Sequence, residues 1–99
     1  MQKITKGQRR YLKGLAHPLK ALVQMGKTGP SESFLAQVQE EVGRHELIKM
    51  RILNNCESTR EEIETPIEDA GIEIIQKVGH VYTLWQKKPE DSLIELPKV

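Results

Sequence analysis

At 99 residues, the chain has room for one hydrophobic core but not for a second domain or a deep substrate cavity. Its four aromatic residues argue against a protein that grips single-stranded bases mainly by stacking. Cys56 is the only cysteine, which excludes a disulfide framework and favours a reducing compartment. No apolar run approaches the roughly 18 residues of a membrane helix, and no signal peptide is visible, so we expect a cytoplasmic protein without a membrane partner.

The net charge of +1 conceals a separation of charge along the chain. Residues 1–30 contain seven basic residues and no acidic one, whereas residues 31–99 contain eight basic and fourteen acidic residues. A basic segment of this kind indicates a polyanionic partner, although an ordinary solvated helix is the simpler alternative. The seven basic residues are Lys3, Lys6, Arg9, Arg10, Lys13, Lys20 and Lys27.

The first predicted helix begins after a cap at Thr5 and runs to about Ala16, and Pro18 ends it. One side of this helix should carry a basic stripe, because its cations recur at helical spacing. The stripe consists of Lys6, Arg10 and Lys13, with Arg9 beside them. The predicted core side consists of Tyr11, Leu12 and Leu15.

A strand, a tight loop and a second helix are predicted next. Residues 21–25 alternate as in a strand covered on both faces, and Pro30 suits the first position of the helix. Between them, two glycines allow positive φ angles, Lys27 supplies a charge, and the helix N-terminus supplies unpaired N–H groups. This combination predicts a phosphate-binding loop at Gly26, Lys27, Thr28 and Gly29, with an ordinary turn as the alternative. A nucleotide-binding P-loop is excluded, since it would need glycine where Ala21 stands.

The remaining elements follow from local patterns. Residues 47–53 form a strand, and a third helix is capped by Ser58 and Glu61 and kinked or broken near Thr65, where a second capping box begins. Residues 72–78 and 81–87 form a hairpin with a two-residue turn. The tail, residues 88–99, is either an edge strand or loose.

These elements predict an α+β (open α/β-like) fold in one domain, residues 1–99. The order α-β-α-β-α-β-β gives a four-stranded mixed sheet packed with three helices. If Ile48, Met50 and Ile52 face the helices, strand parity places four cations on the other face: Lys20, Lys49, Arg51 and Lys77. Alternatively, the first helix packs across that face onto Leu22, Leu47, Leu53 and Ile75.

No catalytic or metal-binding pattern is present. The three histidines, His17, His45 and His80, lie in separate segments without the spacing of metal ligands. The serines and Cys56 lack an identifiable activating group, and the glutamates of the third helix lack a partner that would mark a general acid. We therefore expect a non-enzymatic protein without a metal, cofactor or small-molecule substrate.

Several ordered segments resemble the YhbY-like proteins, stand-alone bacterial members of the CRM (chloroplast RNA splicing and ribosome maturation) domain family. These segments are residues 12–20, 23–29, 45–51, 76–80 and 94–97. The resemblance implies a fold similar to the C-terminal domain of translation initiation factor three. It also implies an RNA-binding protein that associates with precursors of the large ribosomal subunit, through a loop like the GxxG loop of KH domains.

The sequence therefore predicts a monomeric protein whose basic first helix and loop form one continuous surface for the backbone of ribosomal RNA. A protein-interaction module that uses the acidic helices is the alternative. The RNA-binding residues we expect are Gly26, Lys27, Thr28, Gly29, Lys3, Lys6, Arg9, Arg10, Lys13, Lys20, Lys49 and Arg51.

Overall fold

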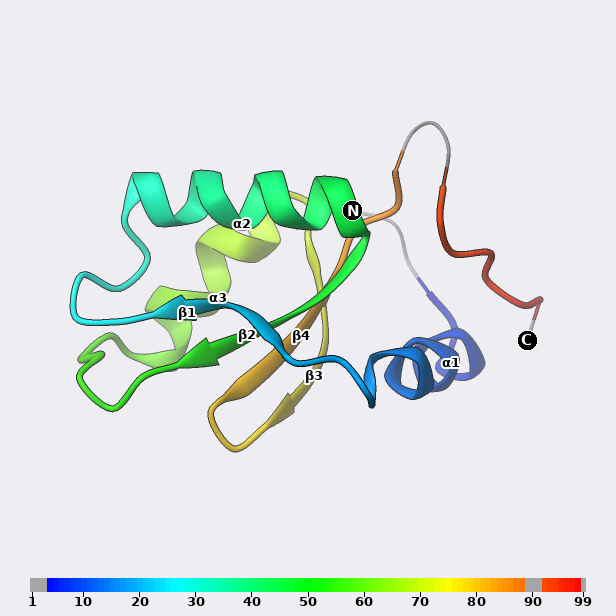
Figure 1. Cartoon of the computed structure of the whole chain (residues 1–99), viewed down its shortest axis with the longest axis horizontal. Coiled ribbons are helices and arrows are strands. Elements are labelled where there is room, and N and C mark those ends of the chain that lie inside the picture. The colour runs from blue at the N-terminus through cyan, green and yellow to red at the C-terminus, as the bar shows by residue number, and fades with distance from the viewer. Residues whose placement is uncertain (1–3, 89–91, 99) are drawn as a thin grey trace.

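The helices and strands follow one another in the predicted order, which confirms the α+β class (Figure 1). The computed structural model describes residues 4–88 and 92–98. The elements are α1 (Lys6–Ala16), β1 (Ala21–Met25), α2 (Glu32–His45), β2 (Leu47–Ile52), α3 (Arg60–Asp69), β3 (Glu73–Val78) and β4 (Val81–Trp85).

The sheet has four strands in the order β1-β2-β4-β3. β1 and β2 are parallel, while β2 pairs with β4 and β4 pairs with β3 in antiparallel fashion, so the predicted mixed sheet is confirmed. Val78 and Val81 pair directly around Gly79, whose φ of 59° suits the predicted two-residue turn. The helix-connected β1 and β2 are neighbours, as expected for a parallel crossover.

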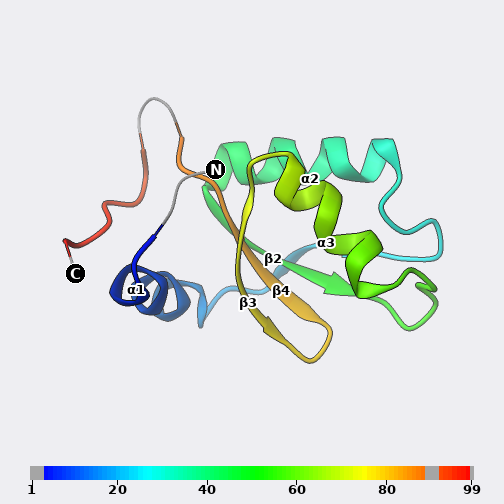
Figure 2. The same cartoon turned by 180° about the vertical axis from the view of Figure 1, so that it is seen from behind.

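The main core lies between one face of the sheet and the two helices α2 and α3, which cover it together (Figures 1 and 2). On β2, Ile48 and Met50 face these helices, as their alternation with Lys49 and Arg51 predicts. The other buried members are Val23, Met25, Val38, Val42, Ile63, Ile67, Ile72, Tyr82 and Leu84.

The opposite face of the sheet is covered at one end by α1. Leu12 and Ala16 pack there against Leu47, Ile75 and Trp85, all of which are buried. The alternative in which the first helix packs across this face is therefore correct for Leu47 and Ile75. It is wrong for Leu22 and Leu53, which do not belong to this group of packed residues. Two residues predicted for the core side of α1 are about 40% exposed, namely Tyr11 and Leu15.

Two helix starts differ from the prediction. Pro30 is not the first residue of α2, because Ser31 has an extended backbone and caps the helix by accepting a hydrogen bond from the Phe34 N–H at 3.2 Å. α3 is capped by Thr59 and Glu62, one residue later than predicted.

α3 is also a single helix that runs through Pro66, without the predicted break near Thr65. Proline removes one backbone donor, which would otherwise serve the carbonyl of Glu62. Glu62 is exposed, so water can satisfy that carbonyl and the helix continues.

Strand irregularities correct two further predictions. The register of β3 shifts between Ile74 and Gln76, so parity reverses and Lys77 lies on the same face as α3. There its Nζ is 2.9 Å from the Glu64 carboxylate. A second register shift lies between Ala21 and Val23, and Leu22 is 48% exposed there. The prediction that β1 is covered on both faces is therefore wrong.

Tyr82 shares this carboxylate of Glu64, to which its hydroxyl donates at 2.8 Å. Burial and the neighbouring Glu64 raise the pKa of Tyr82 to about 12. Burial raises the pKa of Glu64, but the hydrogen bonds from Lys77 and Tyr82 outweigh burial and leave this pKa lowered. Lys77 therefore stabilises a carboxylate on the helix-covered side of the sheet.

The described part of the tail, residues 92–98, packs on the protein without forming a strand. Glu46 is fully buried, and its carboxylate accepts hydrogen bonds from the Ser92 hydroxyl and the Leu93 N–H. Gln8 of α1 donates to the Pro97 carbonyl at 2.9 Å. These contacts hold the tail beside α1, where Ile94 and Leu96 complete the smaller core.

Arg9 joins α1 to β3. Its Nη1 donates to the carbonyls of Ile74 and Ile75 at 3.0 and 2.9 Å, and its Nη2 lies 3.2 Å from the Glu73 carboxylate. The neighbouring Arg10 is exposed and takes part in no ion pair among the described residues. Arg9 therefore has a structural role that its place in the basic segment does not indicate.

We expect Arg9→Ala to lower the free energy of unfolding by about 1–2 kcal/mol, because hydrogen bonds to a charged donor are lost. Arg10→Ala is the matched control and should change this free energy by less than about 0.5 kcal/mol. Urea unfolding followed by circular dichroism measures both. Equal stabilities of the two variants would contradict the structural role of Arg9.

Candidate nucleic-acid interface

The loop after β1 is a tight turn that presents two side chains to solvent. The Gly29 N–H donates to the Gly26 carbonyl at 3.0 Å, and Lys27 and Thr28 are exposed at the tip. Gly29 is buried with a φ of 62°, and a Cβ there would lie 2.4 Å from the Ser58 hydroxyl oxygen. Gly29 thus needs to be glycine, whereas Gly26 has no positive φ and would meet its neighbours at ordinary contact distances.

The helix start behind this turn is less favourable to an anion than predicted. Ser31 already accepts the bond from the Phe34 N–H, and Glu32 places a negative charge in the first turn. An acidic residue there interacts favourably with the helix dipole and opposes a second negative charge. Lys27 and Thr28 are consequently the groups of this region best placed to meet a phosphate.

The loop and α1 do not form one continuous surface. They lie at opposite ends of the longest dimension of the molecule, which is 39 Å (Figure 1). Lys6, Arg10 and Lys13 are exposed on α1, whereas Arg9 is turned to β3. Lys3 lies outside the described residues. The helix and the loop are therefore not adjacent, and any ligand that reaches both must cross the sheet.

Two rows of side chains fill the space between the loop and α1 on the face of the sheet that α1 leaves uncovered. Cross-strand pairing defines the rows: one is Gln76, Thr83, Lys49 and Ala21, and the other is Val78, Val81, Arg51 and Gln24. We call these eight residues the open sheet face, although Thr83 among them is buried. Lys49 and Arg51 lie at its centre, as strand parity predicts.

Two hollows adjoin on this face, and cations line both. One is bordered by Lys20, Lys49 and Arg51, and the other by Lys13, His17 and Lys49. The Lys49 ammonium donates to the His17 carbonyl at 3.3 Å, which links the sheet to the end of α1. Within the described residues, no acidic side chain lines either hollow.

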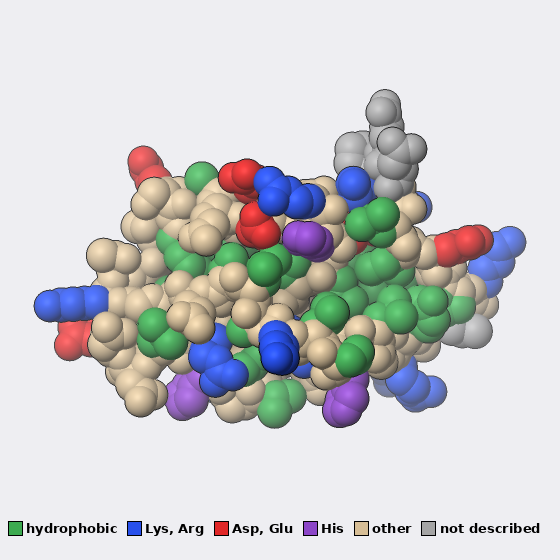
Figure 3. All heavy atoms as spheres, in the orientation of Figure 1, with side chains coloured by type: hydrophobic (Ala, Val, Ile, Leu, Met, Phe, Trp, Pro, Cys, Tyr) green, Lys and Arg blue, Asp and Glu red, His purple; other side chains and the backbone are tan. Residues whose placement is uncertain are grey.

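Apart from Lys87, Lys88 and Lys98 near the C-terminus, the cations of the described residues fall into two groups. Arg9, Arg44, Arg60 and Lys77 form ion pairs with glutamates. Seven other cations take part in none of the ion pairs of the described residues. They are Lys6, Arg10 and Lys13 of α1, Lys20 just before β1, Lys27 of the loop, and Lys49 and Arg51 of the open sheet face. Lys and Arg side chains appear along the lower half of this side of the molecule (Figure 3). The second group is free to attract a polyanion along the long axis.

The acidic helices use several carboxylates within the chain. Glu40 and Glu41 of α2 contact Arg44, Glu62 of α3 caps its own helix, and Glu64 binds Lys77. These contacts leave less free negative charge for the protein-binding face that was the alternative interpretation.

Some residues of the interface were missed by sequence reasoning. His17 is the C-cap of α1, and it also lines a hollow together with Lys13 and Lys49, a position that no pattern in the sequence indicates. Gln76 was hidden by the register shift in β3, which reverses its parity. Gln24, by contrast, could have been predicted: it has polar parity in β1, and it pairs with Arg51 of β2.

Within the described residues, no helix is long and apolar enough to cross a membrane, and no three His, Cys, Asp or Glu side chains gather as a metal site. This part of the protein offers charge, donors and shape to a ligand.

Comparison with known proteins gives a consistent result. The model of the CRS1/YhbY (CRM) domain matches residues 4–86. The chain is 32% identical to "Probable RNA-binding protein YqeI" of Bacillus subtilis over 95% of this chain and 99% of that protein. It is 31% identical to an "RNA-binding protein" of Haemophilus influenzae over 99% of each chain. The solution structure of SAV1595 from Staphylococcus aureus superposes with a TM-score of 0.76 at 34% identity, covering 96% of this chain and 100% of that one.

The loop geometry predicts that its two glycines respond differently to substitution. Gly29→Ala should lower the free energy of unfolding by about 1–3 kcal/mol, because it forces a side chain into a left-handed conformation and against Ser58. Gly26→Ala should change it by less than about 0.5 kcal/mol. Chemical denaturation of both variants measures the difference, and equal losses would contradict the turn described here.

Proposed function

Because the chain belongs to the CRS1/YhbY (CRM) domain family, we propose that it is an RNA-binding protein and that it acts by binding rather than by catalysis. The observation that carries the proposal is the set of unpaired cations that extends over the open sheet face. Such a surface attracts phosphates without reading sequence. The names of its bacterial relatives as RNA-binding proteins support the same conclusion.

The proposed footprint follows the long axis of the molecule. Phosphates meet Lys27 at the loop, then Lys20, Lys49 and Arg51 on the sheet, and finally the exposed cations of α1. The sheet thus takes the central part of the interface, and the loop and α1 extend it in opposite directions. Arg9 contributes little to this footprint, since its guanidinium is occupied by β3.

At the loop, the turn from Gly26 to Gly29 acts as a backbone clamp. Its tip exposes Lys27 and Thr28, and Gly26 and Gly29 on either side add no side chain that would keep an RNA backbone away. Lys27 provides the charge, and Thr28 provides a hydroxyl that can donate to a phosphate oxygen.

The RNA we propose is that of large ribosomal subunit precursors, which this chain would assist during assembly. The support is the YhbY-like character of the sequence, and an elongated cationic face suits a structured RNA better than a short peptide. Crosslinking in cells followed by sequencing of the bound RNA tests the proposal. We expect precursors of the large-subunit RNA to be enriched over small-subunit RNA and messenger RNA, and enrichment of either of the latter would overturn it.

Two lysines on opposite faces of the sheet provide a matched test of the footprint. Lys49→Gln should weaken binding to different RNA sequences about equally, and should reduce the slope of log affinity against log salt by about 0.7 to 1. Lys77→Gln should leave both quantities unchanged, because Lys77 faces α3 and binds Glu64. For the unmodified protein, about five neutralised phosphates on a single strand predict a slope of roughly −3.5.

Fluorescence anisotropy over a range of salt concentrations measures these slopes, with thermal unfolding as a check on the fold. If the two variants lose affinity equally, the open sheet face is not the binding surface. A slope near zero for the unmodified protein would exclude phosphate attraction as the main source of affinity.

A further inference from the structure

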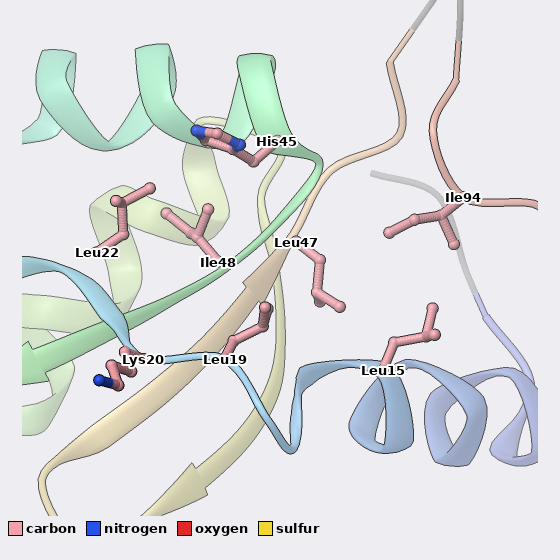
Figure 4. A pocket seen from close by; sticks show the side chains of 8 residues that line it. All are labelled: Leu15, Leu19, Lys20, Leu22, His45, Leu47, Ile48 and Ile94. Carbon is pink, nitrogen blue, oxygen red and sulfur yellow. The ribbon is translucent and has the colours of Figure 1, made fainter.

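An apolar hollow of about 390 Å³ lies next to the open sheet face, between the end of α1 and the end of α2 (Figure 4). We call it the leucine hollow. Its apolar lining consists of Leu15, Leu19, Leu22, Leu47, Ile48 and Ile94. Leu47 and Ile48 belong to the buried cores, whereas the leucines at 15, 19 and 22 are 39–48% exposed. Hydrophobic side chains gather in the same part of the surface in Figure 3.

The shape of the hollow depends on an irregularity in β1. Pairing with β2 passes from Ala21 and Lys49 directly to Val23 and Met50, so Leu22 has no partner across the ladder. β1 is also an edge strand of the sheet, and no other strand of the described residues pairs with its outer edge. The hollow is therefore bordered by backbone donors and acceptors that a ligand can reach.

The leucine hollow is continuous with the cationic surface. Leu19 and Lys20 line both the leucine hollow and the neighbouring hollow of Lys49 and Arg51. In Figure 4, Leu15, Leu19, Leu47 and Ile94 point toward a common space, and Lys20 lies next to Leu19 with its side chain directed away from that space. A ligand that fills both hollows needs a negatively charged backbone beside a group with an apolar surface, and a nucleotide, whose base has apolar faces and polar edges, has this chemistry.

We propose that the leucine hollow binds one unstacked nucleobase of an RNA whose phosphates lie on Lys20, Lys49 and Arg51. This inference rests on the proposed RNA binding and specifies the kind of RNA, namely one with an unpaired nucleotide in a bulge or loop. A regular duplex keeps its bases stacked and cannot place one in the hollow. Apolar side chains can enclose an extruded base where aromatic residues are scarce.

A peptide strand added to the edge of β1 is the competing kind of ligand. The register shift at Leu22 interrupts that edge, and β1 is only five residues long, which makes it a poor template for strand addition. The cationic surface also continues away from β1 to Lys13, which lines the hollow shared with Lys49. Both observations favour RNA.

Three RNA hairpins with one common stem test the proposal, and a non-nucleotide linker closes each stem so that no loop base is available. The first is fully paired, the second carries one bulged nucleotide, and the third carries an abasic site in place of that nucleotide. We expect the unmodified protein to bind the bulged hairpin about tenfold more tightly than the paired one, which corresponds to about 1.4 kcal/mol. The abasic hairpin should lose this advantage, because it keeps the phosphates but not the base.

Protein variants then locate the base. Leu22→Ser should abolish the preference for the bulge and leave affinity for the paired hairpin within about twofold. Leu93→Ser is the matched control, since Leu93 is 63% exposed and does not line the hollow. Lys49→Gln should weaken binding of all three hairpins by a similar factor.

The outcomes separate the two proposals. Equal binding of the bulged and abasic hairpins, or a preference that survives Leu22→Ser in a folded protein, would overturn the base site and leave the hollow to a peptide. No salt-sensitive binding of any hairpin, with Lys49→Gln without effect, would instead overturn the proposed RNA binding. The abasic comparison needs no protein variant, so a folding defect in Leu22→Ser leaves the test intact.

Discussion

The alternation of side chains along β2 decides which face of the sheet is core and which face is free. β2 lies between β1 and β4, so Ile48 and Met50 occupy the middle of the main core. Lys49 and Arg51 must then point to the opposite face. A strand with this sequence could not be covered on both sides without burying two charges, which would cost several kcal/mol if they were unpaired.

The position of α1 respects that constraint. It packs over Leu47, at the end of β2 where the outward side chain is apolar, and it stops before the rows that contain Lys49 and Arg51. Arg9 and the tail fix α1 there, through the carbonyls of β3 and the Pro97 carbonyl. The same contacts that complete the smaller core therefore keep the open sheet face accessible.

Much of the fold follows from local patterns in the sequence. The cap at Thr5, the parity of β2 and the hairpin at Gly79 each depend on residues within a few positions of one another, and each is correct. The role of Arg9 could not be read in this way, because its partners on β3 lie about 65 positions later in the chain. The place of Lys77 depends on a register shift, which arises between strands and leaves no signal in β3 alone.

The sequence indicates which residues are candidates for the site, but it does not indicate how the loop, α1 and β2 are placed relative to one another. The loop and α1 are near in sequence, and this proximity suggested one surface. However, β1 separates them, and five residues in a strand carry the chain about 17 Å. The cations of β2, which are distant in sequence from both, are the ones that connect them in space.

The composition explains why such a site would combine cations with leucines. Tyr82 and Trp85 are buried and Phe34 packs against the main core, so three of the four aromatic residues serve the interior. Phosphate contacts alone would position an RNA without distinguishing paired from unpaired regions. An apolar hollow beside the cations supplies that distinction, because only an unpaired base can leave its stack to fill the hollow. The register shift thus leaves Leu22 without a ladder partner and places it in a hollow that Lys20 also lines, where a bound RNA strand would reach both residues.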